Sequence, residues 1–298
     1  MRAAANINAY LLDAPDVFIE KRTRPLCDVP EMLMGGQPID DGNLILTREQ
    51  KDELVAAEPQ AARFIRPYMT GKDFIDRRPR YCLWLNGAEP SALRKCKIVM
   101  RRVAAVREFR LRSNRAGTLR TAETPALFGA PFECESDYLA LPRVSSERRR
   151  YVPIDYLGRD IIPGDTLFVT PNATFYHLGV LTSSTHMAWM RAVCGRLKSD
   201  YRYSKDVVYN NFPWPAVSAE AVDGIEATAQ AILAARTAHP GESLANLYDD
   251  LLMPPDLRSA HRANDRAVLA AYGWAADLPE EEIVARLMAL YSQLIINN

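Results

Sequence analysis

Residues 196–215, RLKSDYRYSKDVVYNNFPWP, hold the densest group of side chains suited to chemistry or recognition. Lys198 and Asp200 place one hydrogen-bond donor and one acceptor two residues apart. Further along, Asn211 begins the sequence Asn-Phe-Pro-Trp. The first group suggests recognition of a polar ligand, and the second suggests a chemical role.

The segment that begins at Asn211 resembles the Asn-Pro-Pro-aromatic loop that holds the amino group of a target base in DNA methyltransferases, but only in part. In that loop the first proline shapes the turn that aims the asparagine, and here Phe212 takes its place. The sequence also has no glycine-rich strand-to-helix turn that would hold a methyl-donor cofactor. We therefore expect Asn211 to lie in a structural turn rather than in an active site.

Other catalytic patterns are absent from the sequence. It contains no GxxxxGKS/T, GxGxxG, HExxH or GxSxG motif. The five cysteines are scattered, without a CxxC pair, which predicts reduced, mostly buried thiols and no metal site. His177 and His186 flank an apolar helical segment that ends near Cys194, and we expect packed histidines there. A small-molecule enzyme built on these three residues is the least favoured function.

The net charge is zero, but the charges are unevenly distributed. Residues 63–150 carry 20 Lys and Arg against 9 Asp and Glu, whereas residues 1–62 carry 6 against 11. Residues 151–215 are almost balanced, with 6 against 5, and residues 216–298 carry 5 against 12. A basic middle between acidic ends favours a surface for a polyanion such as nucleic acid. The alternative is a set of solvated helix faces that are rich in arginine.

The pattern along the chain predicts a mixed α+β fold. Thr47 is placed to cap a helix that runs to about Glu58, and residues 80–85 (RYCLWL) are typical of a strand. Apolar residues at helical spacing predict a long helix from Ser91 to about Arg112 with an almost wholly basic polar side. Residues 118–170 then read as short strands of a twisted sheet, separated by proline and glycine.

The second half of the chain is predicted to be mainly helical. Residues 174–194 form an apolar helical pattern with a possible break at Thr-Ser-Ser. After Pro215 the spacing of caps and breakers predicts four helices, roughly at residues 218–237, 242–252, 256–272 and 279–294. We accordingly expect two domains, residues 1–215 and residues 216–298. No run of about 18 apolar residues and no secretory leader pattern occurs, which favours a cytoplasmic protein without membrane contact.

Several long stretches resemble one family. They are DVPEMLMGGQPIDDGNLILT, RFIRPYMTGKDFI, RYCLWL, YHLGVLTSSTHMAWMRAVCGRLKSDYRYSKDVVYNNFPWP and LYDDLLMPPDLRSAHRANDRAVLAAYG. The chain is similar in these stretches to the C-terminal part of MmeI-like (type IIL) restriction-modification enzymes. In that family one polypeptide joins a nuclease, an adenine-N6 methyltransferase that uses S-adenosylmethionine, a target-recognition domain and a helical region.

The resemblance implies that this chain is a DNA recognition module without catalytic activity of its own. The nuclease and methyltransferase motifs would lie before Met1, and S-adenosylmethionine and Mg²⁺ would bind only to those domains. The implied partners are double-stranded DNA and the methyltransferase domain of the same polypeptide. The alternative from a different class is a non-specific nucleic-acid-binding module that uses the basic middle alone.

The resemblance also implies which residues read bases. In the major groove a lysine or arginine can donate to guanine O6 and N7, and an aspartate can accept from cytosine N4. Lys198 and Asp200 match one such pair of the family, and Arg143 and Asp165 resemble a second, so both pairs predict G opposite C. The positions that resemble those influencing a neighbouring base are Thr166 and Arg202. The alternative is that these acids form ordinary ion pairs, Asp200 with Lys198 or Arg202 and Asp165 with Arg143.

A separate group of basic residues is predicted to contact the DNA backbone. Three consecutive arginines cannot all reach base edges, so phosphate contacts are the better interpretation for them. The residues in this group are Arg148, Arg149 and Arg150, with Lys72 and Lys205 as weaker candidates. Tyr201 and Tyr203 are expected to pack in the core, to support the recognition loop or to touch the DNA backbone.

Overall fold

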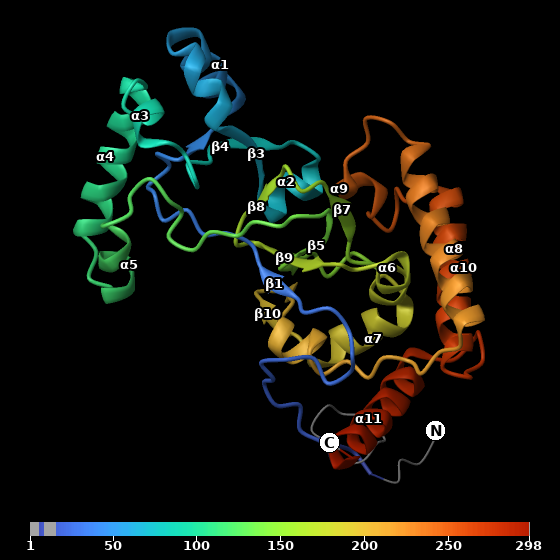
Figure 1. Ribbon diagram of the computed structural model, residues 1–298. Coiled ribbons are helices and arrows are strands. Elements are labelled where there is room, and N and C mark those ends of the chain that lie inside the picture. The colour runs from blue at the N-terminus through green and yellow to red at the C-terminus, as the bar shows by residue number, and fades with distance from the viewer. Residues whose placement is uncertain (1–5, 9–15, 298) are drawn as a thin grey trace. The chain divides into compact units, whose positions relative to one another are not determined.

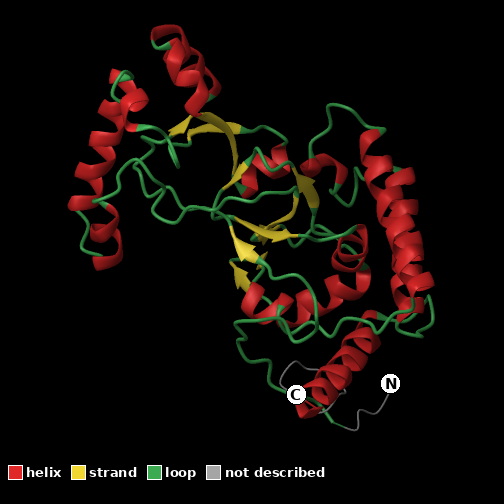
Figure 2. Ribbon diagram, in the orientation of Figure 1, coloured by secondary structure: helices red, strands yellow, loops and turns green. Residues whose placement is uncertain are grey.

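The computed structural model describes residues 6–8 and 16–297. It shows a mixed α+β structure with three small sheets, followed by a C-terminal helical region, as predicted (Figure 1, Figure 2). The chain divides into two compact units. The larger unit comprises the chain up to Leu33, Tyr138–Tyr156 and Thr170–Asn298, and the smaller unit comprises Met34–Asp137 and Leu157–Val169.

The smaller unit contains a four-stranded sheet, five α-helices and a 3₁₀ helix within the described residues. The strand order is β2 (Ile45–Leu46), β4 (Arg80–Leu83), β3 (Ile65–Met69) and β8 (Ile162–Pro163). Strand β3 runs antiparallel to β4 and parallel to β8. The helices are α1 (Arg48–Ala57), a 3₁₀ helix (Pro59–Phe64), α2 (Gly71–Asp76), α3 (Pro90–Leu93), α4 (Lys97–Leu111) and α5 (Ala116–Thr121). One apolar cluster joins the sheet to α4 through buried residues such as Leu44, Phe64, Leu83 and Val99.

Local signals in this unit work as predicted. The Thr47 side chain accepts a hydrogen bond from Gln50 N, and the Gln50 side chain accepts one from Thr47 N, which forms a capping box at the start of α1. The predicted strand at residues 80–85 is present as β4. Both elements are specified by residues within a few positions of each other.

The helix predicted from Ser91 to Arg112 is interrupted. The chain forms α3, leaves the helix at Arg94–Cys96, and resumes as α4. The new start is stabilised by Glu58, whose carboxylate accepts from Ile98 N at 2.7 Å and from Val99 N at 3.5 Å. A buried carboxylate at a helix N-terminus satisfies backbone donors that would otherwise be unpaired. The prediction of one continuous helix was therefore wrong, because its interruption depends on a residue 40 positions away.

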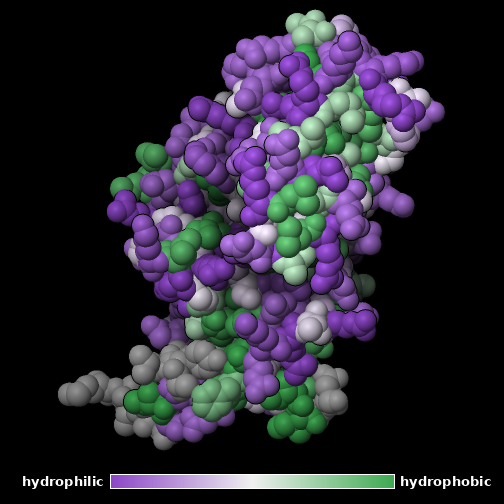
Figure 3. All heavy atoms as spheres, turned by 90° about the vertical axis from the view of Figure 1, so that its left-hand side faces the viewer, coloured by the Kyte–Doolittle hydropathy of each residue, from purple (hydrophilic) through white to green (hydrophobic). Residues whose placement is uncertain are grey.

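The polar side of α4 is basic as predicted, but one of its arginines is structural. Arg110 has no exposed surface, and its guanidinium donates to the backbone carbonyls of Pro38, Ile39, Thr121, Thr124 and Leu127. It thereby joins α4 to the segments before β2 and after α5. Figure 3 looks at the side on which α4 lies and shows mostly hydrophilic side chains with smaller apolar areas between them.

The larger unit contains a three-stranded antiparallel sheet with the order β10 (Gly195–Leu197), β11 (Asp200–Arg202) and β6 (Val144–Ser145). The third small sheet is made of β1 (Leu33–Met34), β5 (Tyr138–Pro142), β7 (Asp155–Leu157) and β9 (Leu167–Pro171). The apolar segment before β10 forms two helices, α6 (Phe175–Leu181) and α7 (Ser184–Val193). Ser183 caps α7 by accepting from His186 N at 3.2 Å, so the predicted break at Thr-Ser-Ser is confirmed.

The C-terminal region is helical. Its elements are α8 (Ala219–Thr237), α9 (Leu244–Leu247), α10 (Pro255–Ala271) and α11 (Glu280–Asn297). Ser218 caps α8 as expected, whereas the helix predicted at residues 242–252 is limited to one short turn. Helices α8 and α10 pack side by side (Figure 1).

A buried polar chain fixes these helices. Arg236 Nε donates to the Tyr248 hydroxyl at 2.7 Å, and this hydroxyl lies 2.9 Å from His261 Nε2. The ring of His261 stacks on Tyr151 with 4.1 Å between centroids. The contacts therefore join α8, α10 and the segment that follows the three consecutive arginines.

Two further sequence expectations concern the whole chain. All five cysteines are free thiols; Cys82 and Cys96 are buried and the other three are half-buried. Within the described residues, no helix is long and apolar enough to cross a membrane.

Candidate nucleic-acid interface

The three-stranded sheet of the larger unit brings together four of the predicted base-reading residues. Leu197 pairs with Asp200, so Lys198 and Ser199 form the two-residue turn of a β-hairpin. Arg202, on the second strand, pairs with Val144 of β6. Arg143 directly precedes β6, and its carbonyl accepts from Tyr203 N at 2.9 Å. The fold thus places Arg143 next to the hairpin that carries Lys198, although 55 positions of sequence separate them.

The hairpin has a polar face and a packed face. Successive strand residues point to opposite sides of a sheet. Asp200 is half-buried and Arg202 is exposed, whereas Tyr201 and Tyr203 between and after them are buried. The Tyr203 hydroxyl lies 2.9 Å from His186 Nε2, and the Arg196 guanidinium covers the Tyr201 ring at 4.0 Å. The tyrosines therefore anchor the hairpin and leave Asp200 and Arg202 on the other side.

Lys198 has an unusual backbone conformation. Its φ is 56°, in the left-handed region that glycine and asparagine normally occupy in hairpin turns. A residue with a Cβ pays about 1–2 kcal/mol for this conformation. Its side chain is exposed at the tip of the hairpin. Lysine thus occupies a position at which glycine would strain the turn less.

The structure also bears on the ion-pair alternative. Across residues 6–8 and 16–297, no ion pair joins Asp200 to Lys198 or to Arg202. The side chain that supports the turn is Arg196, which donates to the Ser199 carbonyl at 2.9 Å and lies 4.0 Å from Glu147. Lys198 and Asp200 are therefore not held by each other.

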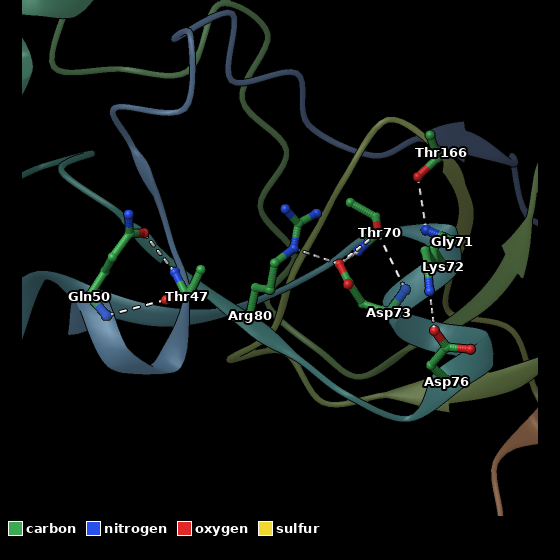
Figure 4. A network of polar contacts seen from close by, with 9 residues as sticks. All are labelled: Thr47, Gln50, Thr70, Gly71, Lys72, Asp73, Asp76, Arg80 and Thr166. Carbon is green, nitrogen blue, oxygen red and sulfur yellow. Dashed lines mark hydrogen bonds and ion pairs between the residues drawn. The ribbon is translucent and has the colours of Figure 1, made fainter. Parts of the chain in front are cut away.

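The smaller unit brings together the remaining base-reading candidates, Asp165 and Thr166, with Lys72. The Thr166 hydroxyl accepts from Gly71 N at 2.8 Å, at the start of α2 (Figure 4). A Cβ added to Gly71 would lie 2.9 Å from the Thr166 carbonyl oxygen, so only glycine allows this approach. The Asp165 carboxylate accepts from Gln37 Nε2 at 3.3 Å. Asp165 and Arg143 belong to different units. Their joint readout of one G·C pair stays a prediction.

Lys72 and Lys205, the weaker candidates for phosphate contacts, each have an acidic neighbour. Lys72 Nζ lies 2.5 Å from Asp76 on the next turn of α2 (Figure 4). Lys205 Nζ lies 2.9 Å from Asp206 in a π-helical turn, Lys205–Tyr209. Such surface pairs contribute about 0–1 kcal/mol, so either lysine can exchange its partner for a phosphate at small cost.

The three consecutive arginines lie in the loop between β6 and β7. Arg148 and Arg150 are exposed, and Arg149 is half-buried. The Arg150 guanidinium lies 5.7 Å from the centroid of the buried Tyr151 ring. Together with Tyr201 of the hairpin, the arginines line an open cavity of about 420 Å³. This proximity to the hairpin was not predictable from the sequence.

Asn211 is structural, as the sequence predicts. It is fully buried, and its Nδ2 donates to the carbonyls of Glu20 at 2.8 Å, Asp206 at 3.0 Å and Val207 at 3.1 Å. The following Phe212 is fully buried as well. A side chain held by three backbone carbonyls beneath the surface cannot grip a base.

The histidines near Cys194 are also packed. Burial lowers the pKa of His186 to about 3 and lowers the pKa of His177, whose Nδ1 accepts from Thr174 N at 3.0 Å. Burial raises the pKa of the Cys194 thiol. An imidazole with a lowered pKa is a weaker base, and a thiol with a raised pKa is less often ionised, which does not support a nucleophile and base at this place. No group of three or more acidic, histidine or cysteine side chains suited to a metal ion occurs in the described part of the chain.

Sequence reasoning missed the residues that position the candidates. Gln37 contacts Asp165 from 128 positions away, and Arg196 supports the turn through a backbone carbonyl. Gly71 gave one usable signal, since it follows Thr70 at the start of a helix, but its contact with Thr166 lies 95 positions away. Only the fold reveals these contacts.

The described residues form a mixed α+β part that carries a β-hairpin, followed by a C-terminal helical region. The chain belongs to the MmeI family, because it matches the MmeI target recognition domain over residues 13–216 and the MmeI C-terminal domain over residues 217–297.

Two relatives show how much of a longer protein this chain matches. DNA methyltransferase A of Bacillus subtilis (strain 168) is 34% identical over 293 residues, which is 98% of this chain and 33% of that protein. A solved structure of the Type IIL restriction-modification enzyme MmeI in complex with DNA is 40% identical, with a TM-score of 0.95 over 98% of this chain and 39% of that one. The chain thus spans between a third and two fifths of the length of these relatives.

Proposed function

We propose that this chain recognises a short specific sequence in duplex DNA and holds it for a SAM-dependent adenine-N6 methyltransferase of a restriction-modification system. The observation that carries the proposal is the hairpin tip, where Lys198 and Asp200 are presented without pairing to each other. The likeness to an enzyme solved in complex with DNA supports it. Methylation, and cleavage where a nuclease is present, would be performed by domains other than the two matched here.

In this proposal the hairpin reads one G·C pair. The Lys198 ammonium donates to O6 and N7 of guanine, and the Asp200 carboxylate accepts from N4 of the paired cytosine. Arg143 and Asp165 read a second G·C pair in the same way. Thr166 and Arg202 influence the base next to these pairs.

The phosphate contacts come from residues around the readers. Arg148, Arg149 and Arg150 serve as the main contacts, and Lys72 and Lys205 contribute after leaving their acidic neighbours. Phosphate contacts fix the register of a protein on DNA and supply affinity that depends on salt, but they carry no sequence information.

The proposal assigns no cofactor to this chain. S-adenosylmethionine and Mg²⁺ would bind to the methyltransferase and nuclease domains of a parent enzyme, and the methyltransferase domain would be a partner within the same polypeptide. The whole enzyme would act on DNA in the cytoplasm.

The test is selection from a duplex library. The purified chain is incubated with duplexes that contain a randomised central segment, and the bound fraction is sequenced. Enrichment of one sequence with at least two G·C positions is the expected result. Equal binding of all sequences would instead favour a non-specific nucleic-acid-binding module, for which the basic residues 63–150 are the supporting observation.

A further inference from the structure

Helix α10 carries a row of arginines although it lies in the most acidic part of the sequence. Arg258, Arg262 and Arg266 are four residues apart, so they lie on one side of the helix. The neighbouring side, about 100° around the helix, is buried and includes Leu257, His261 and Asp265. The row is about 12 Å long at 1.5 Å per residue.

Two arginines of this row have no acidic partner among the residues that the structure describes. Arg258 Nη1 lies 3.6 Å from the Asp250 carboxylate. No ion pair involves the exposed Arg262 or Arg266 within the residues that the structure describes. Their charges are therefore available to a ligand from outside the chain.

Arg262 and Arg266 lie close to the loop between β6 and β7 that carries the three consecutive arginines. Arg262 and Arg266 line an open cavity of about 360 Å³ together with Arg150 and Ser184. Arg150 and Ser184 also line the neighbouring cavity of about 420 Å³ that reaches Tyr201 of the hairpin. A continuous surface thus leads from the hairpin, past the consecutive arginines, to α10.

A buried hydrogen bond fixes α10 against this loop. The Tyr151 hydroxyl donates to the Asp265 carboxylate at 2.6 Å, and Ser184 N donates to the same carboxylate at 2.7 Å. Tyr151 follows Arg150 in sequence, and Asp265 lies between Arg262 and Arg266. The two cationic groups are therefore placed relative to each other by a contact that lies beneath the surface.

Most of the acidic residues along this surface already have a partner within the chain. Glu280 makes a bidentate pair with Arg191, at 2.7 and 2.8 Å. Asp265 is buried and accepts the two hydrogen bonds described above. The remaining exposed acid at the α10 cavity is Asp277, against Arg150, Arg262 and Arg266. Among the exposed side chains that line this cavity without an ion pair in the described part of the chain, three are arginines and one, Asp277, is acidic.

We propose that Arg262 and Arg266, together with Arg150, form a second phosphate-binding surface that holds the DNA backbone outside the base pairs read by the hairpin. Four residues of helix rise by about 6 Å, close to the roughly 6.8 Å by which two phosphate steps of one strand advance along the DNA axis. The inference rests on the proposed function and extends it, because it gives the C-terminal helical region a role in DNA binding and predicts a footprint longer than the recognition sequence.

The test compares the chain with its Arg262→Gln/Arg266→Gln variant on duplexes of two lengths. One duplex carries the selected sequence with long flanks, and the other is trimmed to that sequence. With long flanks, the variant should lower the slope of log affinity against log salt by about 1.8, since each released counterion contributes about 0.9. Between 50 and 200 mM salt, the ratio of the affinity of the unaltered chain to that of the variant should therefore fall by about 12-fold. On the trimmed duplex the two proteins should bind alike.

A charge-preserving control completes the design. Arg262→Lys/Arg266→Lys keeps both charges, so its salt slope should equal that of the unaltered chain on both duplexes. Thermal unfolding should be the same for all three proteins because both side chains are exposed. The inference is overturned if the glutamine variant and the unaltered chain have the same salt slope on long duplexes. It is also overturned if the variant loses as much affinity on trimmed duplexes as on long ones. If the unaltered chain selects no sequence, the proposed function fails instead.

Discussion

At Lys198, at the tip of the hairpin, one substitution can remove the side chain and leave the backbone of the turn as it is. Replacement by glycine removes the donor but keeps the left-handed turn, in which φ is 56°. Relief of the left-handed strain, about 1–2 kcal/mol, is opposed by the backbone entropy of glycine, about 0.5–1 kcal/mol. The hairpin should therefore stay folded, with an unchanged or slightly raised melting temperature.

The expected loss is confined to one base pair. A good bidentate contact is worth about 1–3 kcal/mol of discrimination against the wrong base, or roughly 5- to 150-fold. Lys198→Gly should lose this preference for G at one position while the other positions keep theirs. The exchange Lys198→Glu with Asp200→Arg should go further and favour C at that position, because the acid and the base then meet the opposite partners.

The assay is competition between duplexes that differ at single base pairs, at one fixed salt concentration. Ser199→Ala is the matched control, because Ser199 shares the turn and its carbonyl, which accepts from Arg196, is kept by alanine. It should leave every preference unchanged. Readout by Lys198 is refuted if Lys198→Gly keeps the original ratio at all positions, or if the exchange variant still prefers the original base.

Three other outcomes follow from the geometry. Arg148→Ala should weaken binding to all duplexes about equally and lower the salt slope by about 0.9 in a salt titration, whereas a change in sequence preference would contradict a phosphate contact. Gly71→Ala should displace the Thr166 backbone, whose oxygen would lie 2.9 Å from the new Cβ; library selection should then show altered preference beside the second G·C pair, and unchanged selection would exclude a role for this contact. The pKa of His186 is lowered by burial from 6.5 to about 3, so its stabilising contribution is present above pH 6.5 and is lost as the pH falls. Denaturant titrations should show that His186→Gln reduces the slope of unfolding free energy below pH 6.5 by about 1.4 kcal/mol per pH unit, and parallel slopes would contradict this assignment.

Features specified by neighbouring residues were predictable. The Thr47–Gln50 capping box and the break at Ser183 depend on contacts over three residues, and the sequence contains both partners within one turn. Capping and hydrophobic spacing act at this range. The order of helices and strands could therefore be read from the sequence in outline.

Features specified by distant partners were not predictable. Arg110 has the same sequence character as the exposed arginines of α4, yet it is buried because five backbone carbonyls from other segments surround it. The left-handed conformation of Lys198 follows from the register of two strands and not from the residue type. The resemblance to the family supplied both proposed readout pairs, but only the fold reveals that Arg143 adjoins the hairpin.

The distribution of charge shows why totals per segment mislead about nucleic-acid binding. Residues 216–298 carry 5 basic and 12 acidic side chains, which predicts repulsion from DNA. Three of the five basic residues nevertheless lie in one row on α10, and only Arg258 of that row has an acidic partner within the described residues. A phosphate interacts with the charges within about one Debye length, near 10 Å at 0.1 M salt. Local placement therefore decides which helix can hold DNA, and an acidic segment can contribute a basic surface.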